Sequence, residues 1–299
     1  MGPGSLNEMK AYNRVLLAAG VASTIAVLSV YAVSVKRRPE VSKPGVRRVV
    51  SLSTSAAETL IAIGAGSKLV GVDDYTKKCL PECRNLPSVG TGAKVSLESV
   101  LGLSPDLVIA WSYDGDSVRR LRGLGLHVAA LDVPHGVQEV LDLIVRTAAE
   151  VGLEREGKRL VKGIETDLAA AARRERTPGP LVYYELYTGY KSVGKGTYTH
   201  ELIERAGGRN LAGDSPVRYP ILNSERIIEM DPDVIIVCEG GDSPEAIRAR
   251  PGWSGLKAVR QNRIHVMPTK LSTPGPDLPK ALRQMIKWFQ TQGAEAPSE

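Results

Sequence analysis

The stretch SLESVLGLSPDLVI, residues 96–109, recurs in altered form as NSERIIEMDPDVII at residues 223–236. Each copy begins with a helix-capping residue, places glutamate two positions later and continues as a short apolar helix. Each copy then runs through Pro-Asp into an apolar stretch typical of a buried β-strand. A helix–strand unit that occurs twice predicts two similar α/β lobes, and we expect function in the cleft between them.

Strand and helix patterns alternate around both copies. Strand patterns occur in both halves of the chain, at 46–52, 69–72, 107–111, 128–131 and 181–184. A second pair of segments also matches, LIAIGAGSKLVG at 60–71 and LIERAGGRNLAG at 202–213. The alternation predicts an α/β fold of two Rossmann-like lobes with mostly parallel sheets, an N-terminal lobe over 47–150 and a C-terminal lobe over 180–291.

A long helix is predicted between the lobes, over residues 153–176. This segment contains no proline, and its apolar residues recur near a helical period until Thr177-Pro178-Gly179-Pro180 ends it. At 1.5 Å per residue the helix would be about 35 Å long, enough to reach from one lobe to the other. We therefore expect one long α-helix to join the lobes, and a short tail at 292–299 to follow them.

An N-terminal tail over 1–14 precedes an uncharged, mostly apolar run, VLLAAGVASTIAVLSVYAV. This run predicts a transmembrane anchor or a signal segment over 15–35, because about 20 apolar residues cross a bilayer. Its length favours an uncleaved anchor, although small residues near its end would permit cleavage of a signal peptide. The basic residues at 36–38 conflict with an outside location, since the positive-inside rule places such a cluster in the cytoplasm. An extended linker over 36–46 follows.

Composition and motifs argue against several function classes. The 299-residue chain has a net charge of +6, but its Lys and Arg residues are scattered rather than gathered in a basic stripe with aromatics. We therefore expect no nucleic-acid partner. The chain has no Gly-x-Gly-x-x-Gly after its first strand, no P-loop and no Gly-x-Ser-x-Gly elbow. We expect neither catalytic residues nor a cofactor.

The cysteines suggest one structural bond. Cys79 and Cys83 lie four residues apart in a Pro-containing loop, which predicts a small local disulfide in an extracytoplasmic protein. Cys238 ends an apolar strand and is expected to be a buried thiol. The histidines show no metal-ligand spacing, so we predict no metal site.

Several motifs together resemble one known family, the substrate-binding proteins (class III) that serve ATP-binding-cassette importers of cobalamin, iron–siderophores and haem. The motifs are RVVSL at 48–52, ETL at 58–60, LVGVDDY at 69–75, LPSVG at 86–90, the segment from Leu97-Glu98 to Ala110-Trp111, HELIERAGG at 200–208, NSE at 223–225 and RPGW at 250–253. The resemblance extends over residues 47–290. It implies two lobes joined by one long helix, and a stiff binder that closes only slightly.

Aromatic residues at the ends of strands are the candidate ligand contacts. Aromatics are only 5% of the chain, so those near loops are informative. Tyr75 and Trp111 each follow a strand, and Tyr219 lies in a loop of the second lobe, while Tyr187 and Tyr190 follow the strand at 181–184. The resemblance implies aromatic contacts with a flat ligand at Trp111, Tyr219 and Tyr75. The alternative is that Trp111 caps a core and the tyrosines are ordinary loop residues.

Glu98 and Glu225 occupy matching positions in the two copies of the repeat. Complementarity with a helix dipole, worth about 0.3–1 kcal/mol, would explain each position. The resemblance implies instead that one glutamate at the tip of each lobe docks onto arginines of the membrane permease. We expect both carboxylates to be exposed, on opposite lobes and on the cleft side.

These observations together predict a monomeric, extracytoplasmic solute-binding protein that its N-terminal helix anchors to the cell membrane. It would bind a corrinoid (cobalamin) in the cleft and deliver it to an importer made of a permease and its ATPase subunits. A binder of ferric siderophore or haem on the same scaffold is the first alternative. A metal-chelatase-like enzyme is another, and it would require His135 to face Asp114 or Asp116 across the cleft. A structural surface protein would need no cleft aromatics.

Overall fold

The computed structural model describes residues 45–171 and 179–290 of the chain. The predicted anchor over 15–35, the tail over 292–299 and most of the linker lie outside the described residues. Within the described part of the chain, no helix is both long and apolar enough to cross a membrane. All described residues belong to one unit, Gly45–Glu299.

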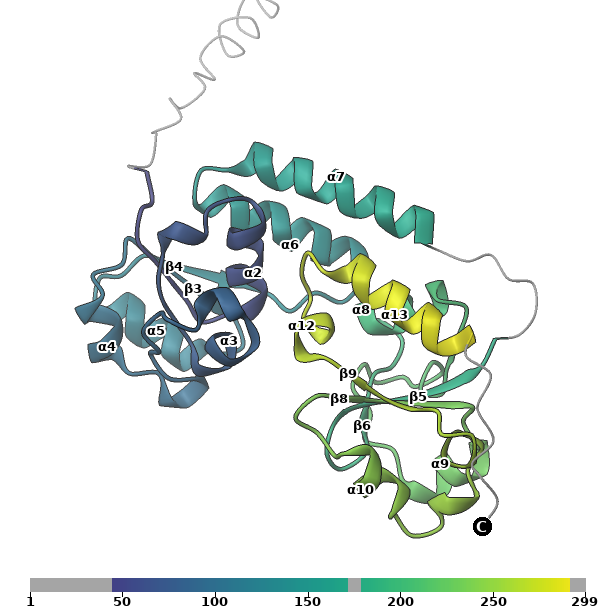
Figure 1. Ribbon diagram of the computed structural model, residues 1–299. Coiled ribbons are helices and arrows are strands. Elements are labelled where there is room, and N and C mark those ends of the chain that lie inside the picture. The colour runs from purple at the N-terminus through teal and green to yellow at the C-terminus, as the bar shows by residue number, and fades with distance from the viewer. Residues whose placement is uncertain (1–44, 172–178, 291–299) are drawn as a thin grey trace, which may run out of the picture. The chain divides into compact units, whose positions relative to one another are not determined.

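The N-terminal lobe, on the left in Figure 1, is built on a parallel four-stranded sheet. Its strand order is β2-β1-β3-β4. Its strands are β1 (Val49–Ser51), β2 (Leu69–Val72), β3 (Leu107–Trp111) and β4 (Val128–Leu131). Its helices are α2 (Thr54–Ala62), α3 (Asp74–Cys79), α4 (Leu97–Gly102) and α5 (Gly115–Gly123). The strands are almost entirely buried, which is why they read as apolar runs without alternation.

The C-terminal lobe repeats this plan with one antiparallel strand. Its sheet has the order β6-β5-β8-β9, and β7 also pairs with β5. The strands are β5 (Leu181–Tyr187), β6 (Lys191–Ser192), β7 (Arg209–Asn210), β8 (Val234–Cys238) and β9 (Ile264–Met267). The helices are α8 (Tyr198–Arg205), α9 (Ser224–Met230), α10 (Pro244–Arg248), α11 (Lys257–Arg260), α12 (Thr269–Ser272) and α13 (Leu278–Gln290). Only β6 runs antiparallel to its neighbour.

The repeated sequence forms the same contacts in both lobes. Ser96 caps α4 and Asn223 caps α9. Each side chain accepts a hydrogen bond from the backbone N–H three residues later. The aspartate after each proline then ties its strand to the first strand of the lobe. Asp106 accepts from the backbone of Arg48 at 2.9 Å, and Asp233 accepts from the backbone of Leu181 at 2.8 Å. The duplicated sequence therefore encodes a duplicated structural unit.

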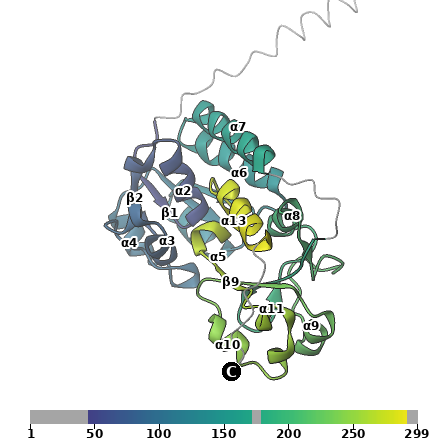
Figure 2. The same ribbon diagram turned by 45° about the vertical axis from the view of Figure 1, so that its right-hand side comes forward.

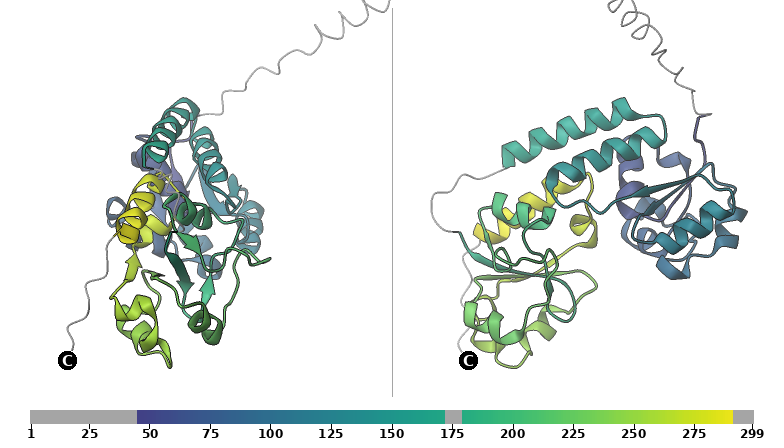
Figure 3. Two further views of the ribbon diagram at one scale, coloured as in Figure 1. Left: turned by 90° about the vertical axis from the view of Figure 1, so that its right-hand side faces the viewer. Right: turned by 180° about the vertical axis from the view of Figure 1, so that it is seen from behind.

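Two helices, rather than one, occupy the region between the lobes. α6 (Val137–Glu150) and α7 (Glu154–Ala171) follow each other across a short turn at Gly152 and lie side by side (Figures 1 and 3). α7 begins one residue later than expected, and residues 172–176 of the predicted helix lie outside the described part. α7 and α8 both pack against α13 (Figure 2).

α6 contributes to the cores of both lobes. Ile144 belongs to the apolar cluster of the C-terminal lobe, whereas Leu143 belongs to a cluster of the N-terminal lobe. The expected boundary at residue 150 placed this helix with the N-terminal lobe alone. Two neighbouring faces of the helix instead serve the two lobes, so α6 is a packed connection between them.

Candidate functional site

A cavity of about 670 Å³ lies between the two lobes. Several strands end at it: Trp111 ends β3, Tyr187 ends β5 and Cys238 ends β8. Its other lining residues are Thr54, Ser55, Asp73, Tyr75, Thr91, Gly92, Tyr113, Asp114, Val133, Leu186, Lys191, Val193, Tyr198, Thr199, Tyr219, Glu239, Ser272, Thr273 and Pro274. The carboxyl ends of parallel strands are where α/β proteins bind ligands. This cavity is therefore the candidate binding site.

The N-terminal wall carries three aromatic rings. Trp111 and Tyr113 are stacked, with ring centroids 6.2 Å apart and planes inclined by 12°. Trp111 packs partly on the lobe's core and also lines the cavity. Tyr75 lies in the first turn of α3, and Asp73 caps the N-terminus of this helix. Burial raises the pKa values of Tyr75 and Tyr113 to about 12, so both are neutral phenols at neutral pH.

The C-terminal wall combines tyrosines with one lysine. Lys191 lies over the rings of Tyr187 and Tyr219, at 5.6 Å and 5.9 Å from their centroids. Tyr198, at the start of α8, is buried, and its hydroxyl donates to the Ser272 carbonyl oxygen. Rings from both lobes therefore face one cavity.

Tyr190 lies elsewhere, which corrects its prediction as a ligand contact. Its backbone has a positive φ of 63° in the turn between β5 and β6. Its ring lies 6.0 Å from that of Trp253, and the guanidinium of Arg250 lies 4.6 Å above it. Arg250 is also bonded to the buried Glu185 at 2.7 Å. Tyr190 is thus part of the packing behind the sheet.

Acidic groups outnumber basic ones on the cavity wall. The described lining residues include the carboxylates of Asp73, Asp114 and Glu239, against the single ammonium of Lys191. Burial raises the pKa values of Asp73 and Asp114. The backbone N–H of Thr269, at 2.8 Å, holds the pKa of Glu239 below its usual range. The lining therefore holds three carboxyl groups against one ammonium among the described residues.

The predicted disulfide between Cys79 and Cys83 is not formed, and the two thiols lie in different surroundings. Cys79 and Cys83 are both free cysteines. Cys79 ends α3, and burial raises its pKa while the hydroxyl of Thr269 opposes that shift. Cys83 is fully buried in the core of the N-terminal lobe. Cys238 is buried as expected, with its sulfur 3.2 Å from the Tyr184 hydroxyl.

The pairing that a chelatase-like enzyme would need is absent from the described residues. His135 does not line the cavity, and its Nδ1 lies 3.8 Å from the carboxylate of Glu139. Asp114 lines the cavity, whereas Asp116 is ion-paired with Arg119. The described chain also holds no group of three His, Cys, Asp or Glu side chains able to bind a metal.

Glu98 and Glu225 are both exposed, in the first turns of α4 and α9. Neither carboxylate forms an ion pair with any residue that the structure describes. α4 belongs to the N-terminal lobe and α9 to the C-terminal lobe, and neither glutamate lines the cavity. One glutamate therefore lies on each lobe, as expected.

Sequence reasoning did not identify several lining residues. Tyr113 lies two residues after Trp111. Its position just after a predicted strand was therefore a sufficient signal to identify it. Tyr198 and Lys191 carried no such signal, because one begins a helix and the other lies on a two-residue strand. The residues from Ser272 to Pro274 reach the cavity only through tertiary packing.

Comparison with known proteins shows related chains. Residues 49–271 match the family described as periplasmic binding protein. A protein of Bacillus subtilis, described as an uncharacterized ABC transporter substrate-binding lipoprotein, is 28% identical, covering 85% of this chain and 81% of its own. A cobalamin-binding protein of Halobacterium salinarum is 32% identical, covering 81% of this chain and 69% of its own.

Solved structures agree with this relationship. The periplasmic haem-binding protein of Roseiflexus sp. RS-1 in its apo form superimposes with a TM-score of 0.74 at 29% identity. The match covers 82% of this chain and 98% of that one. The family resemblance inferred from the sequence motifs is confirmed, and so is the two-lobed α/β fold.

Proposed function

Because the chain belongs to the periplasmic binding protein family, we propose that it is the substrate-binding component of an ATP-binding-cassette importer and captures a corrinoid between its lobes. Its relatives are binding proteins, and the chain is accordingly not an enzyme. The bound corrinoid would then be delivered to the permease. We propose that the protein works as a monomer outside the cytoplasm, held at the membrane by residues 15–35.

The observation that carries this proposal is the set of aromatic rings that both lobes turn toward one cavity. Trp111, Tyr113 and Tyr75 lie on one wall, and Tyr187 and Tyr219 lie on the other. Aromatic rings offer flat apolar area at a low cost in side-chain entropy, which suits a flat macrocycle. The cavity also contains several serine and threonine hydroxyls, which can bond to the amide groups around a corrin ring.

The charge of the wall supports a corrinoid over haem. Haem carries two propionate groups, whereas the substituents around a corrin ring are largely uncharged amides. Three carboxylates against one ammonium on the wall would repel a dianionic ligand more than a neutral one. The relative at 32% identity, described as cobalamin-binding, also supports this choice.

Haem is the second candidate ligand, and a specific observation favours it. Tyr75, Tyr187 and Tyr219 are phenols on the cavity wall, and a tyrosine oxygen is a known ligand of haem iron. The haem-binding protein of Roseiflexus is also similar in sequence and structure. Ferric siderophores are a further possibility on the same scaffold.

Calorimetric titration of the full chain with cobalamin, haemin and a ferric siderophore tests these ligands side by side. We expect cobalamin to bind most tightly. In fluorescence it should also quench the emission of Trp111, and this quenching should be absent in Trp111→Phe. Tighter binding of haemin, with a shifted Soret band, would replace the corrinoid with haem. No binding of any of the three would contradict the proposed ligand class.

We further propose that Glu98 and Glu225 dock the loaded protein onto basic residues of the permease. Their exposure and their matching positions on the two lobes support this role. Charge pairs at an interface rim mainly fix orientation and accelerate encounter.

A further inference from the structure

A short segment of the C-terminal lobe lies against the N-terminal lobe. Residues 273–277, Thr-Pro-Gly-Pro-Asp, connect α12 to α13, and we call this segment the strap. The hydroxyl of Ser55 on α2 donates to the carbonyl oxygen of Pro274. Gly275 is buried against Glu58 of α2 so closely that an added Cβ would lie 2.6 Å from Oε2 of Glu58. The strap is therefore a tight contact between lobes that are far apart in sequence.

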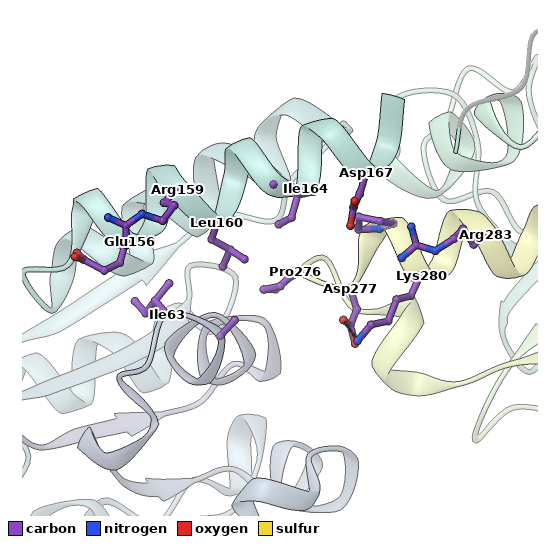
Figure 4. Close-up of a pocket in the computed structure, with 13 residues that line it drawn as sticks. Ile63, Glu156, Arg159, Leu160, Ile164, Asp167, Pro276, Asp277, Lys280 and Arg283 are labelled. Carbon is purple, nitrogen blue, oxygen red and sulfur yellow. Dashed lines mark ion pairs between the residues drawn. The ribbon is translucent and has the colours of Figure 1, made fainter. Parts of the chain in front are cut away.

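The strap separates the ligand cavity from a second cavity. Thr273 and Pro274 line the ligand cavity, together with Ser55. Pro276 and Asp277 line a cavity of about 470 Å³, which the end of α2, α7 and the start of α13 complete (Figure 4). Because cavities lie on both sides of it, the strap is a thin point of contact, and any separation of the lobes here must lift it from α2.

Glu58 is the buried polar group under the strap. Its side chain is 5% exposed, and no described residue donates a hydrogen bond to either of its carboxyl oxygens. Asp277 is the charged side chain that acts most strongly on it, and a carboxylate can only accept a hydrogen bond. A hydrogen bond between the two carboxyl groups therefore needs a proton.

Among the described residues, two lysines pair with Asp277 and none pairs with Glu58. Asp277 is ion-paired with Lys280 at 2.7 Å and with Lys270 at 3.6 Å. Burial, with the Asp277 charge as the next cause, raises the pKa of Glu58 to about 8, although Lys270 and Lys280 oppose the shift.

Other elements packed against α2 also carry titratable or charged groups. β1 has none, and η1 (Gly66–Lys68) carries Lys68. α3 and its cap carry Asp73, Asp74, Tyr75, Lys77, Lys78 and Cys79. α6 carries Glu139, Asp142, Arg146 and Glu150. None of these is among the largest causes of the pKa shift of Glu58. The titration of Glu58 is therefore set chiefly by its burial under the strap and by the three charged groups of the C-terminal lobe.

We propose that Glu58 is a proton-controlled lock between the lobes, which holds the strap on α2 when protonated and releases it when ionised. This inference rests on the proposed function only in that release of the strap would loosen one wall of the ligand cavity. The lock itself is a property of the lobe interface and needs no ligand.

The sign of the pH dependence follows from linkage. When the strap lifts, Glu58 meets water and its pKa returns toward the ordinary value of 4.5. The seated state, in which the strap lies on α2, therefore binds the proton more tightly. The free-energy advantage that this proton gives the seated state is complete below about pH 4.5. That advantage is lost as the pH rises toward 8, where Glu58 ionises in the seated state too. Over this window the opening constant rises by up to about tenfold per pH unit.

Hydrogen exchange of the full chain without ligand tests the lock. Gly275 is buried against Glu58, so the exchange of its backbone amide reports the opening of the strap. We expect its opening constant, corrected for intrinsic exchange, to rise between pH 5 and 8 in the wild type. In Glu58→Gln, which cannot ionise, the constant stays flat, while the exposed-site control Glu82→Gln behaves as the wild type. Equal pH profiles in wild type and Glu58→Gln would overturn the proposal.

A second variant covers the case in which Glu58→Gln does not fold. Asp277→Asn removes the charge that disfavours ionised Glu58 and supplies an amide donor, so the rise in opening should level off at a lower pH. An unchanged profile in Asp277→Asn would contradict the lock. If the chain bound no corrinoid but kept these exchange profiles, only the proposed ligand would fail.

Discussion

Trp111 and Tyr113 form one continuous aromatic surface on the N-terminal wall of the cleft. We expect Trp111→Ala to weaken corrinoid binding about tenfold to a hundredfold, because a large flat contact is lost and its neighbour loses its stacking partner. This corresponds to about 1.4–2.8 kcal/mol. Calorimetric titration measures the change.

Tyr190→Phe is the matched control for this prediction. Tyr190 packs beside Trp253 and Arg250, away from the cavity, so its variant should bind ligand as the wild type does. Tyr187→Ala, three residues earlier on the cavity wall, should weaken binding. Equal affinities for Tyr187→Ala and the wild type would remove Tyr187 from the site.

Asp114 tests the electrostatic preference of the cleft. We expect Asp114→Asn to raise haemin affinity severalfold, because a carboxylate on the wall no longer repels the propionates, and to leave corrinoid affinity nearly unchanged. Asp116→Asn is the control, since Asp116 is exposed and paired with Arg119. A haemin affinity that does not respond to Asp114→Asn, measured at low ionic strength, would count against charge as the selecting factor.

Tyr187 and Tyr190 show where sequence reasoning reached its limit at the scale of residues. Both follow the same predicted strand, so the pattern treats them alike. The chain reverses between them, and the positive φ of Gly189 and Tyr190 sends the second ring toward Trp253. Such a reversal depends on local turn geometry that strand periodicity does not encode. Cys79 and Cys83 pose the same problem, because sequence spacing does not say which way a thiol points.

At the scale of elements, β9 and α13 are joined by a stacked pair of rings. His265 lies on Trp288 with ring centroids 4.8 Å apart, and its Nε2 is buried with no partner among the described residues. Burial, helped by the charge of Arg263, lowers the pKa of His265 to about 4. The ring is therefore neutral in the folded protein at neutral pH.

Acid should weaken the folded state through His265. Its pKa in the unfolded chain is the ordinary 6.5, so the unfolded state binds more protons and stability falls as pH drops from 6.5 toward 4. The slope stays below the limit of about 1.4 kcal/mol per pH unit because the two states differ by less than one bound proton, and solvent screens part of the shift at this partly exposed ring. Chemical denaturation of His265→Phe should show a smaller loss over this window. An unchanged loss would exclude His265 as its source.

Helix caps and the alternation of strands and helices were predictable at the scale of elements, whereas the role of α6 was not. Ser53, Ser96 and Asn223 are capping residues whose side chains make the expected bonds to the backbone. The α6 sequence reads as an ordinary amphipathic helix, and the pattern cannot say that Leu143 and Ile144 face different lobes. That information lies in the tertiary arrangement of residues far apart in the chain.

At the scale of the whole molecule, internal duplication gives each lobe one wall of the cavity and one exposed glutamate. The aspartates that follow the prolines, Asp106 and Asp233, anchor equivalent strands, so equivalent helices begin at equivalent edges. This symmetry was visible in the sequence because the repeat preserves the residues that cap, turn and anchor. Two lobes built in this way can present Glu98 and Glu225 together to a single partner.

Charge reversal tests whether the permease reads both glutamates. We expect Glu98→Arg with Glu225→Arg to abolish stimulation of the importer's ATPase in reconstituted vesicles, because both rim contacts become repulsive. Each single reversal should leave partial stimulation. Corrinoid affinity should stay unchanged, since neither residue lines the cavity. The control reverses Glu229, which lies on α9 and is paired with Arg226. Full stimulation by the double variant would mean that docking depends on another surface, and helix-dipole complementarity would then suffice to explain both glutamates.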